Sequence, residues 1–376
     1  MPIQLDSVFP GGNIIVDDIS GDRVRLHQDL RDTQYDWFYW CFRARGAGGR
    51  TVHFEFTTSR ALGARGPAAS LDGGLTWQWL GSEAVDGNAF SYSFPEDASE
   101  VRLSFAMPYQ ESNWLRFLDT LDCTTASRHK LCSTTKARDV DYMLLGRPES
   151  EPQHRAAITC RHHCCEMMVN YTLEGLIRWV ASGYEDESKW LRNRVQFLLV
   201  PFVDKDGVED GDQGKGRRPR DHGRDYEGES LYATTGAIRD LVPSWGNDRL
   251  HVGLDLHCPH ISGGTNEVIY QVGSRHEHMS QQQVRFSQIL ESVASGPLPF
   301  LAADFMPFGT SWNTAENYRD GRSFAGWVAE LPGVALGTSI ELPYATARGA
   351  EVKQASARGF GKDLGMALAT YLQALP

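Results

Sequence analysis

The middle of the chain reads Arg161-His162-His163-Cys164-Cys165-Glu166. A short apolar run over residues 156–160 leads into this stretch and predicts a buried strand, and a helical pattern over residues 167–180 leads out of it. His163 and Glu166 are three residues apart, so they share one face of a helical turn at a strand-to-helix junction. An imidazole and a carboxylate placed in this way can bind zinc and leave one position for water. Because the spacing H-x-x-E is common, other residues must support a metal site.

The composition is that of an ordinary globular protein. The chain has 376 residues, of which 41% are hydrophobic and 23% charged, and this length suits two domains or one large core. The formal net charge of -11 argues against a broad phosphate-binding surface, so we expect no nucleic-acid partner. No run of about 18 apolar residues is present, which predicts no membrane-spanning helix. Seven cysteines, an odd number, and no signal-like N-terminus favour a cytoplasmic protein without a disulfide framework.

Alternating residues in the first third of the chain predict an all-β domain. Segments 51–57 and 101–106 place apolar side chains at every second position, which is the pattern of strands with one buried face. Glycine-rich turns separate such segments, and short strands at this spacing indicate a β-sandwich over residues 1–122. The polar stretch that follows has no clear period, and we interpret residues 123–139 as a linker.

Strand and helix patterns alternate in the rest of the chain, residues 140–376. Strand candidates lie at residues 195–203, 250–256 and 334–340, and the last helix is expected over residues 362–375. Alternating strands and helices predict an α/β domain in which helices cover both faces of a sheet.

Three features lie downstream of the central stretch. His257 ends the second strand candidate, at the position where α/β sheets bind ligands, and Asp255 is placed to orient its ring. Glu341 lies in an otherwise apolar strand, where burial would raise the pKa of its carboxyl toward that of a general base. Residues 215–226 hold five cations within ten residues and suit an anion. Each feature alone also has an ordinary explanation: a strand-end histidine, a buried ion pair and a solvated charge run.

Together and in this order, these residues resemble the zinc carboxypeptidase family. The family pattern is R-x-H-x-x-E, then D-G-V and D-x-N-R, then D-x-H, then a strand with threonine and the catalytic glutamate. Here the matching stretches are residues 161–166, 206–208, 221–224, 255–257 and 338–341. The N-terminal part resembles the β-sandwich that precedes the catalytic domain in the cytosolic carboxypeptidase subfamily. The resemblance implies a mixed, mostly parallel sheet flanked by helices, preceded by that sandwich.

The resemblance also implies a metal site and a base. His163, Glu166 and His257 would bind one Zn2+ per chain, and Glu341 would be the general base for a zinc-activated water.

On the substrate side, Arg224 matches the arginine of the Asn-Arg pair with which the family binds a terminal carboxylate. Gly223 stands where the family has asparagine, so half of this pair is missing. Tyr318 is a candidate for the family tyrosine that precedes the catalytic glutamate. For the cation that stabilises the oxyanion we predict Arg217, and the alternatives are Lys215 and Arg218.

These roles imply a zinc metallocarboxypeptidase, a protease that hydrolyses the C-terminal peptide or isopeptide bond of acidic or modified peptides. Because cations cluster near the carboxylate site of an acidic chain, we expect a peptide partner with a free, acidic C-terminus. Two other functions stay open: an aspartoacylase-like zinc amidohydrolase, and a catalytically weak module that binds acidic peptides on the same fold. A structural metal site formed by cysteines is a rival interpretation, which the absence of C-x2-C spacing disfavours; its candidates are Cys160, Cys164, Cys165 and Cys258.

Overall fold

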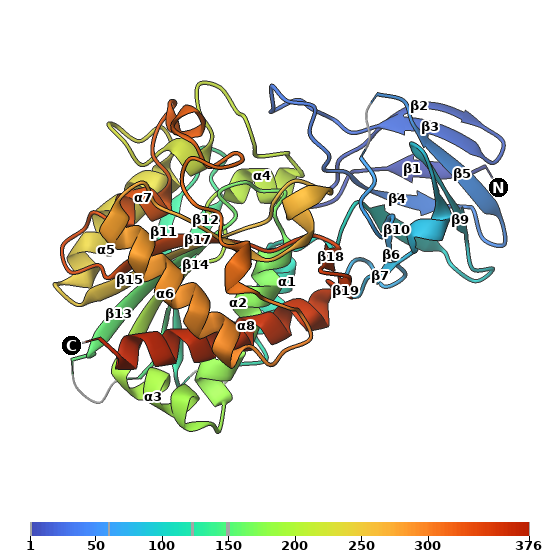
Figure 1. Cartoon of the computed structure of the whole chain (residues 1–376). Helices are drawn as coiled ribbons and strands as arrows, with labels where there is room; N and C mark the ends of the chain where they lie inside the picture. The colour runs from blue at the N-terminus through green and yellow to red at the C-terminus, as the bar shows by residue number, and fades with distance from the viewer. Residues whose placement is uncertain (1, 59–60, 122–123, 148–150, 376) are drawn as a thin grey trace.

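The structure is a computed structural model of the chain, and it describes residues 2–58, 61–121, 124–147 and 151–375. Two parts lie beside each other: an N-terminal part made of strands, and a larger C-terminal part in which helices surround a sheet (Figure 1). Within the described residues, no helix is long and apolar enough to cross a membrane.

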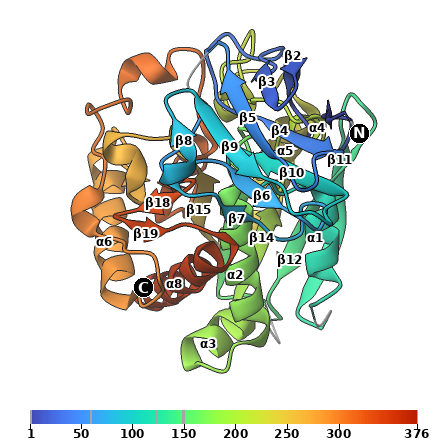
Figure 2. The ribbon, with the colours of Figure 1, turned by 90° about the vertical axis from the view of Figure 1, so that its right-hand side faces the viewer.

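The N-terminal part consists of two sheets that share an aromatic core. Its strands are β1 (Gln4–Asp6), β2 (Ile15–Ser20), β3 (Arg23–His27), β4 (Cys41–Arg45), β5 (Thr51–Phe56), β6 (Ala68–Ser70), β7 (Gln78–Trp79), β8 (Val85–Asp86), β9 (Ala89–Ser93) and β10 (Glu100–Ser104). In the described part of the chain they form the orders β1-β4-β10-β6-β7 and β2-β3-β5-β9-β8. Figure 2 looks onto this part, with β5 and β9 in front. The rings of Phe42 in β4 and Phe54 in β5 lie 5.4 Å apart, so the two sheets pack face to face.

The segment that we expected to be a linker belongs to the C-terminal sheet. After helix α1 (Glu111–Leu118), strands β11 (Ala126–Ser133) and β12 (Asp139–Leu145) pair with each other, and β11 is an edge strand. The linker predicted over residues 123–139 is therefore wrong for β11. A mostly exposed edge strand has no buried face, which is why its sequence shows no apolar alternation. Residues 122 and 123, at the predicted boundary, lie outside the described residues.

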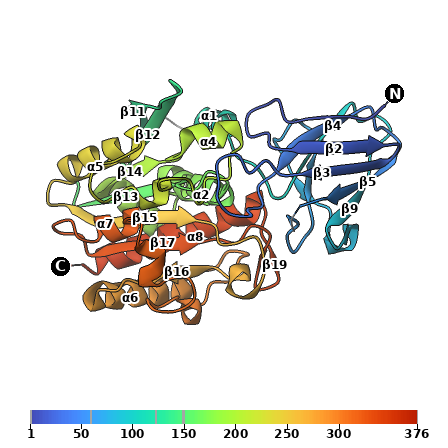
Figure 3. The ribbon, with the colours of Figure 1, turned by 90° about the horizontal axis from the view of Figure 1, so that it is seen from above.

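The C-terminal sheet has the order β11-β12-β14-β13-β15-β17-β16, which Figure 3 shows from above. Its centre is parallel and consists of β14 (Val195–Val200), β13 (His154–Cys160), β15 (Leu250–His257) and β17 (Leu336–Glu341). Antiparallel pairs complete both edges, with β12 beside β14 and β16 (Tyr270–Val272) beside β17. The central strands are buried almost throughout, as strands covered on both faces must be.

Helices cover both faces of this sheet. On one face lie α2 (Met168–Ser182), α3 (Asp186–Arg194), α6 (Glu277–Val293) and α8 (Gln354–Gln373), and on the other α5 (Ala233–Gly246) and α7 (Phe324–Val328). Successive residues of β13 point into separate apolar cores, with Ala157 on the α5 side and Ile158 on the α2 side. The remaining short elements are α4 (Lys205–Asp210), which follows β14, and the antiparallel pair β18 (Thr346–Ala347) and β19 (Ala350–Glu351). The predicted mixed α/β fold is confirmed, with its parallel pairs confined to the four central strands.

Candidate metal centre and active site

Three neighbouring parallel strands end at one edge of the sheet and position the candidate residues. β15 ends at His257 and β17 at Glu341, and these two residues face each other in the strand register. β13 ends at Cys160, and the following residue, Arg161, has a positive φ of 63° that turns the chain toward α2. The carboxyl edge of parallel strands is the usual ligand-binding edge of α/β sheets.

Arg161 is buried and stabilises this turn. Its guanidinium donates to the carbonyl oxygens of Cys164 at 2.7 Å and Tyr109 at 2.9 Å. It also donates to Oδ1 of Asn170 in α2 at 2.8 Å. A left-handed conformation costs a non-glycine residue about 1–3 kcal/mol, and these bonds offset that cost. The arginine of the R-x-H-x-x-E pattern thus fixes the backbone on which His163 and Glu166 are carried.

His163, Glu166 and His257 converge on one point. Nδ1 of His163 lies 2.8 Å from Oε1 of Glu166, and Nδ1 of His257 lies 2.7 Å from Oε2. Although burial acts to raise it, the pKa of Glu166 is held well below its ordinary value by the two histidines, so its carboxylate stays charged. Two imidazole nitrogens that face both oxygens of one buried carboxylate are the donor set of a catalytic zinc site, so the residues present fit this ion.

The outer nitrogen of each histidine also faces a carboxylate. Oδ2 of Asp255 lies 2.7 Å from Nε2 of His257, and Oδ1 of Asp221 lies 3.5 Å from Nε2 of His163. Such partners fix the tautomer and orientation of metal-binding histidines. The sequence pattern predicts this role for Asp255. It also contains the signal for Asp221, an acid three residues before Arg224, but that role is not among the predictions.

A further histidine lies behind the candidate ligands and is absent from the sequence predictions. Nδ1 of His162 lies 2.9 Å from Oδ1 of Asp255, and Nε2 of His162 lies 2.8 Å from the hydroxyl of Tyr226. Asp255 therefore bridges the rings of His162 and His257, and it also accepts a hydrogen bond from Thr159 at 2.8 Å. No group of possible metal ligands found among the described residues contains a cysteine, which gives the rival cysteine site no support.

Glu341 faces this centre from the neighbouring strand end. The side chain is buried, and its Oε2 has no hydrogen-bond partner among the described residues. Burial raises the pKa of Glu341 to about 7, against the opposing effect of His257. A carboxyl with a pKa near neutrality can accept and return a proton at physiological pH, as a general base requires.

Two of the three cation candidates for the oxyanion differ clearly in position. Nζ of Lys215 lies 3.4 Å from Nε2 of His163, within the site. Its charge also acts on Glu341, where it opposes the rise in pKa. Arg218 is exposed. Lys215 is thus the member of this trio that lies beside the metal-site residues.

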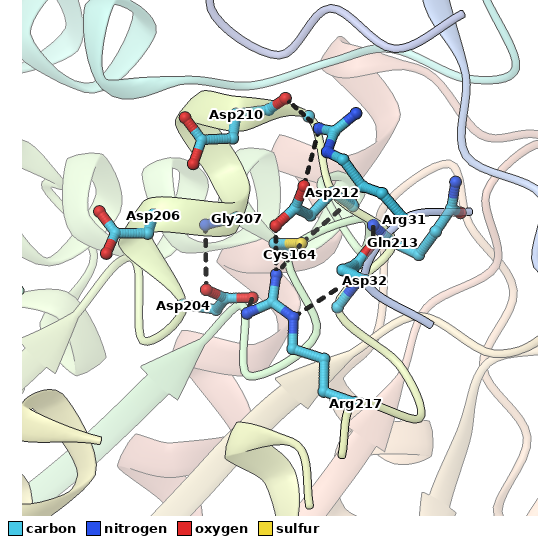
Figure 4. A network of polar contacts seen from close by, with 12 residues as sticks. Arg31, Asp32, Cys164, Asp204, Asp206, Gly207, Asp210, Asp212, Gln213 and Arg217 are labelled. Atoms are coloured by element: carbon cyan, nitrogen blue, oxygen red, sulfur yellow. Dashed lines mark hydrogen bonds and ion pairs between the residues drawn. The ribbon is translucent and has the colours of Figure 1, made fainter. Parts of the chain in front are cut away.

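Arg217, the first choice for the oxyanion, lies in a different environment. Its guanidinium contacts three carboxylates at 2.7–3.0 Å, those of Asp32, Asp204 and Asp212 (Figure 4). Because these partners occupy its donors, Arg217 is not available to stabilise an oxyanion. The role predicted for it is therefore not supported, and its charge serves an ion-pair network between the two parts of the chain.

The predicted substrate contacts form a second group beside His163. The guanidinium of Arg224 lies 4.8 Å from the ring centre of Tyr318, and its Nε donates to the carbonyl of Asn317 at 2.9 Å. Gly223 packs against the metal-site histidine, since a Cβ atom there would lie 2.9 Å from Nε2 of His163. A larger residue at this position would therefore require a small shift of the His163 ring.

A cavity of about 370 Å3 lies beside β17. Gly337, Ser339 and Tyr318 line it, and Ser339 is two residues from Glu341 on the same strand. The cavity therefore adjoins the edge of the sheet at which Glu341 lies, and its volume is at the lower end of that of ligand pockets. Its charged lining residues are Glu227, Arg275, Arg319, Arg322 and Glu330.

Solved structures share the fold of this chain. A metallo-carboxypeptidase from Burkholderia cenocepacia superposes with a TM-score of 0.80 and 22% identity, over 99% of this chain and 99% of that chain. A metallo-carboxypeptidase from Pseudomonas aeruginosa, solved in complex with (2-guanidinoethylmercapto)succinic acid, gives a TM-score of 0.77 and 20% identity, over 98% and 99% of the two chains. At this level of identity the likeness shows the fold.

Curated relatives match over shorter stretches. An uncharacterized protein from Zymomonas mobilis is 20% identical over 55% of this chain and 55% of its own length. Cytosolic carboxypeptidase 3 from Bos taurus is 25% identical over 41% of this chain, and the match spans 17% of that protein. No protein-family model matches the chain. The chain thus has the fold of the metallo-carboxypeptidases, and its resemblance to the zinc carboxypeptidases is confirmed at that level.

Proposed function

We propose that the chain is a zinc-dependent metallocarboxypeptidase that hydrolyses the C-terminal peptide or isopeptide bond of acidic or modified peptides. One observation carries this proposal: Nδ1 of His163 and Nδ1 of His257 face the two oxygens of Glu166, and Glu341 lies beside them at the adjacent strand end. A hydrolase that activates water requires metal ligands of this kind and a carboxyl group beside them.

The residues of the chain have separate tasks in this reaction. His163, Glu166 and His257 would hold Zn2+, which would supply an acidified water molecule and polarise the scissile carbonyl. Glu341 takes the proton of the attacking water and later returns it to the leaving amine, and its pKa of about 7 suits both transfers. Asp255 keeps the ring of His257 in place through its outer nitrogen, and Asp221 places a second carboxylate 3.5 Å from the outer nitrogen of His163.

Lys215 replaces Arg217 as the cation that we assign to the oxyanion. Its ammonium group lies 3.4 Å from Nε2 of His163, and its charge acts on Glu341, so Lys215 is the candidate cation for the negative charge that would develop on the substrate oxygen. A fixed cation in a water-poor site stabilises such charge more strongly than it would in water.

Arg224 is the proposed partner of the substrate's terminal carboxylate. Its Nε and Nη1 donate to the backbone carbonyls of Asn317 and Gly223, which fixes the plane of the guanidinium. The Pseudomonas aeruginosa neighbour is bound to a succinic acid derivative, and a carboxylate of that kind suits an arginine.

The cavity beside β17 is the proposed pocket for the C-terminal side chain. Three arginines and two glutamates line it, and Glu330 is already paired with Arg322 at 2.6 Å. Arg319 is paired with Glu316. Arg275 lies 3.4 Å from Nε2 of His276 and has no carboxylate partner among the described residues, so we assign it to an acidic side chain of the substrate.

A panel of matched peptides tests this function. The peptides share one sequence and end in Glu, Lys, Phe or an amidated Glu, and an N-acylated amino acid is included for the amidohydrolase alternative. We expect the highest kcat/KM for the free Glu terminus and slow turnover of the amide. A preference for Lys would contradict the charge argument, equal rates on free and amidated ends would contradict the role of Arg224, and turnover of the acylated amino acid alone would favour the amidohydrolase.

A further inference from the structure

The loop that carries Lys215 contains several glycines, so it has little tendency to adopt one conformation by itself. Residues 211–217 follow α4, and three of them, Gly211, Gly214 and Gly216, have positive φ values of 73°, 79° and 72°. Glycine in such conformations loses more backbone entropy on ordering than other residues do. Something outside the loop must therefore hold it in the single conformation that brings Lys215 to His163.

A segment of the N-terminal part provides that support. Residues 29–39 connect β3 and β4 of the first part and reach across to the loop. The carboxylate of Asp32 accepts hydrogen bonds from two successive backbone amides, those of Gln213 at 2.9 Å and Gly214 at 2.8 Å. It also accepts from Nε of Arg217 at 3.0 Å (Figure 4). One side chain thus fixes three donors of the loop around an anionic centre.

The neighbours of Asp32 continue this contact along the loop. Oγ1 of Thr33 donates to the carbonyl of Lys215 itself at 2.6 Å. The backbone amide of Gln34 donates to the carbonyl of Gly216 at 3.3 Å, and a Cβ at Gly216 would lie 2.5 Å from the ring of Tyr35. Every residue from 213 to 217 therefore has a bond or a close contact to residues 29–39.

On its other side the loop presses against the metal-site turn. A Cβ atom at Gly214 would lie 2.3 Å from the backbone nitrogen of Cys164, so the loop and the turn touch without a side chain between them. Trp37 of the same N-terminal segment donates from Nε1 to Sγ of Cys165 at 3.4 Å. Residues 29–39 thus contact both the loop with Lys215 and the turn that bears His163 and Glu166.

We propose that Asp32 is a positioning residue of the active site, and that the N-terminal part holds the 211–217 loop so that Lys215 stays beside His163. This inference rests on the proposed function, because the task of Lys215 is to stabilise charge during hydrolysis. The N-terminal part is then required for full turnover through the position that it gives to Lys215.

The substitution Asp32→Asn tests the contact without removing the side chain. An amide can accept at one oxygen only, so its NH2 group faces the donors of Gly214 and Arg217. Hydrogen–deuterium exchange on the metal-free protein reads this directly: we expect faster exchange at residues 213–217 in the variant and unchanged exchange in β13 and β15. Asp86→Asn, on the exposed strand β8, is the matched control and should exchange as the wild type does.

Kinetics then separate positioning from general destabilisation. We expect Asp32→Asn to lower kcat about tenfold, less than the 10²–10³ reported for loss of an oxyanion donor, with zinc content unchanged. In a Lys215→Ala background the same substitution should lower kcat less than about twofold, because its effect acts through Lys215. Thr33→Val, which removes the bond to the carbonyl of Lys215, should show the same pattern if Asp32→Asn fails to fold.

Three results would overturn the inference. The first is hydrogen–deuterium exchange at residues 213–217 of Asp32→Asn at the wild-type rate, and the second is a wild-type kcat of both Asp32→Asn and Thr33→Val. The third is a kcat of the double variant Asp32→Asn/Lys215→Ala that is lowered by the product of the two single effects. Failure of the proposed function itself looks different. In that case the wild type neither binds zinc nor cleaves any peptide, whereas the exchange result stands by itself.

Discussion

Two regions of the candidate site are positioned in different ways: the proposed metal ligands with Glu341, and the loop that carries Lys215. His257 and Glu341 are opposite each other at the ends of hydrogen-bonded strands, and β13 delivers His163 and Glu166 beside them. Lys215 lies on a glycine-rich loop that accepts from and donates to residues 29–39 of the N-terminal part. Strand register places His257 and Glu341 directly, whereas the loop with Lys215 is contacted by a segment far away in sequence, as the separation of Asp32 and Gln213 (181) shows.

The largest expected effect is on the strand side and concerns the general base. Glu341→Gln keeps the shape of the side chain but cannot accept a proton, so kcat should fall by about 10³-fold. Zinc content should stay at the wild-type level, since Glu341 is not one of the proposed ligands. Glu83→Gln, at an exposed position in the N-terminal part, is the control. Activity of Glu341→Gln within twofold of the wild type would refute the assignment of the base.

The next effect is on the loop side. Lys215→Ala should lower kcat about 10²-fold with a small change in KM, because the charge that it stabilises develops during the reaction. Arg218→Ala, three residues further on and exposed, should match the wild type. Steady-state kinetics of the two variants on one peptide measure the effects of Lys215 and Arg218 on kcat. A larger loss of kcat in Arg218→Ala than in Lys215→Ala would contradict the assignment of Lys215.

A smaller effect is expected from Arg224, and it should depend on the substrate. Arg224→Gln should raise KM for a free-acid peptide about tenfold or more, which corresponds to loss of a hydrogen bond to a charged group of ~1.5–3 kcal/mol. The amidated peptide has no carboxylate at that end and should show an unchanged KM. A similar rise for both peptides would mean that Arg224 supports the site without binding the carboxylate.

The smallest effect concerns stability and pH in the network of Figure 4. Burial and the charge of Asp32 raise the pKa of Asp212 from 3.8 to about 6, so the folded state favours its neutral form. Its stabilising contribution is complete below about pH 4 and is lost as the pH rises through 6. Between pH 4.5 and pH 7.5 the metal-free wild type should therefore lose about 1–2 kcal/mol of unfolding free energy more than Asp212→Asn does. Parallel pH dependences in urea unfolding would contradict this.

The sequence was most informative where function depends on strand ends. A short motif contains both the strand that fixes a residue and the residue itself, so His163, Glu166, His257 and Glu341 could be predicted together. Asp221 and His162 were missed because their roles depend on which ring nitrogen they face, and spacing along the chain does not determine that.

In the loop of residues 211–217 the sequence shows which residues carry a positive charge, but it does not show where their side chains point. Lys215 and Arg217 are two residues apart, and they point to different places because three carboxylates hold Arg217 while Lys215 turns toward His163. One of those carboxylates, Asp32, lies in the other part of the chain, beyond the reach of a local pattern. The close approach of Gly223 to His163 is likewise a distance in space, and only the folded chain shows it.

Metal analysis of the purified protein tests the central claim most directly. After dialysis under zinc-replete conditions, the wild type should hold one Zn2+ per chain, and His163→Ala and His257→Ala should each lose most of it while retaining their helical content by circular dichroism. His129→Ala, an exposed histidine on the edge strand β11 and outside the site, should bind zinc like the wild type. A wild type with far less than one zinc per chain, or a His163→Ala variant that binds zinc as the wild type does, would contradict the assignment of the metal centre.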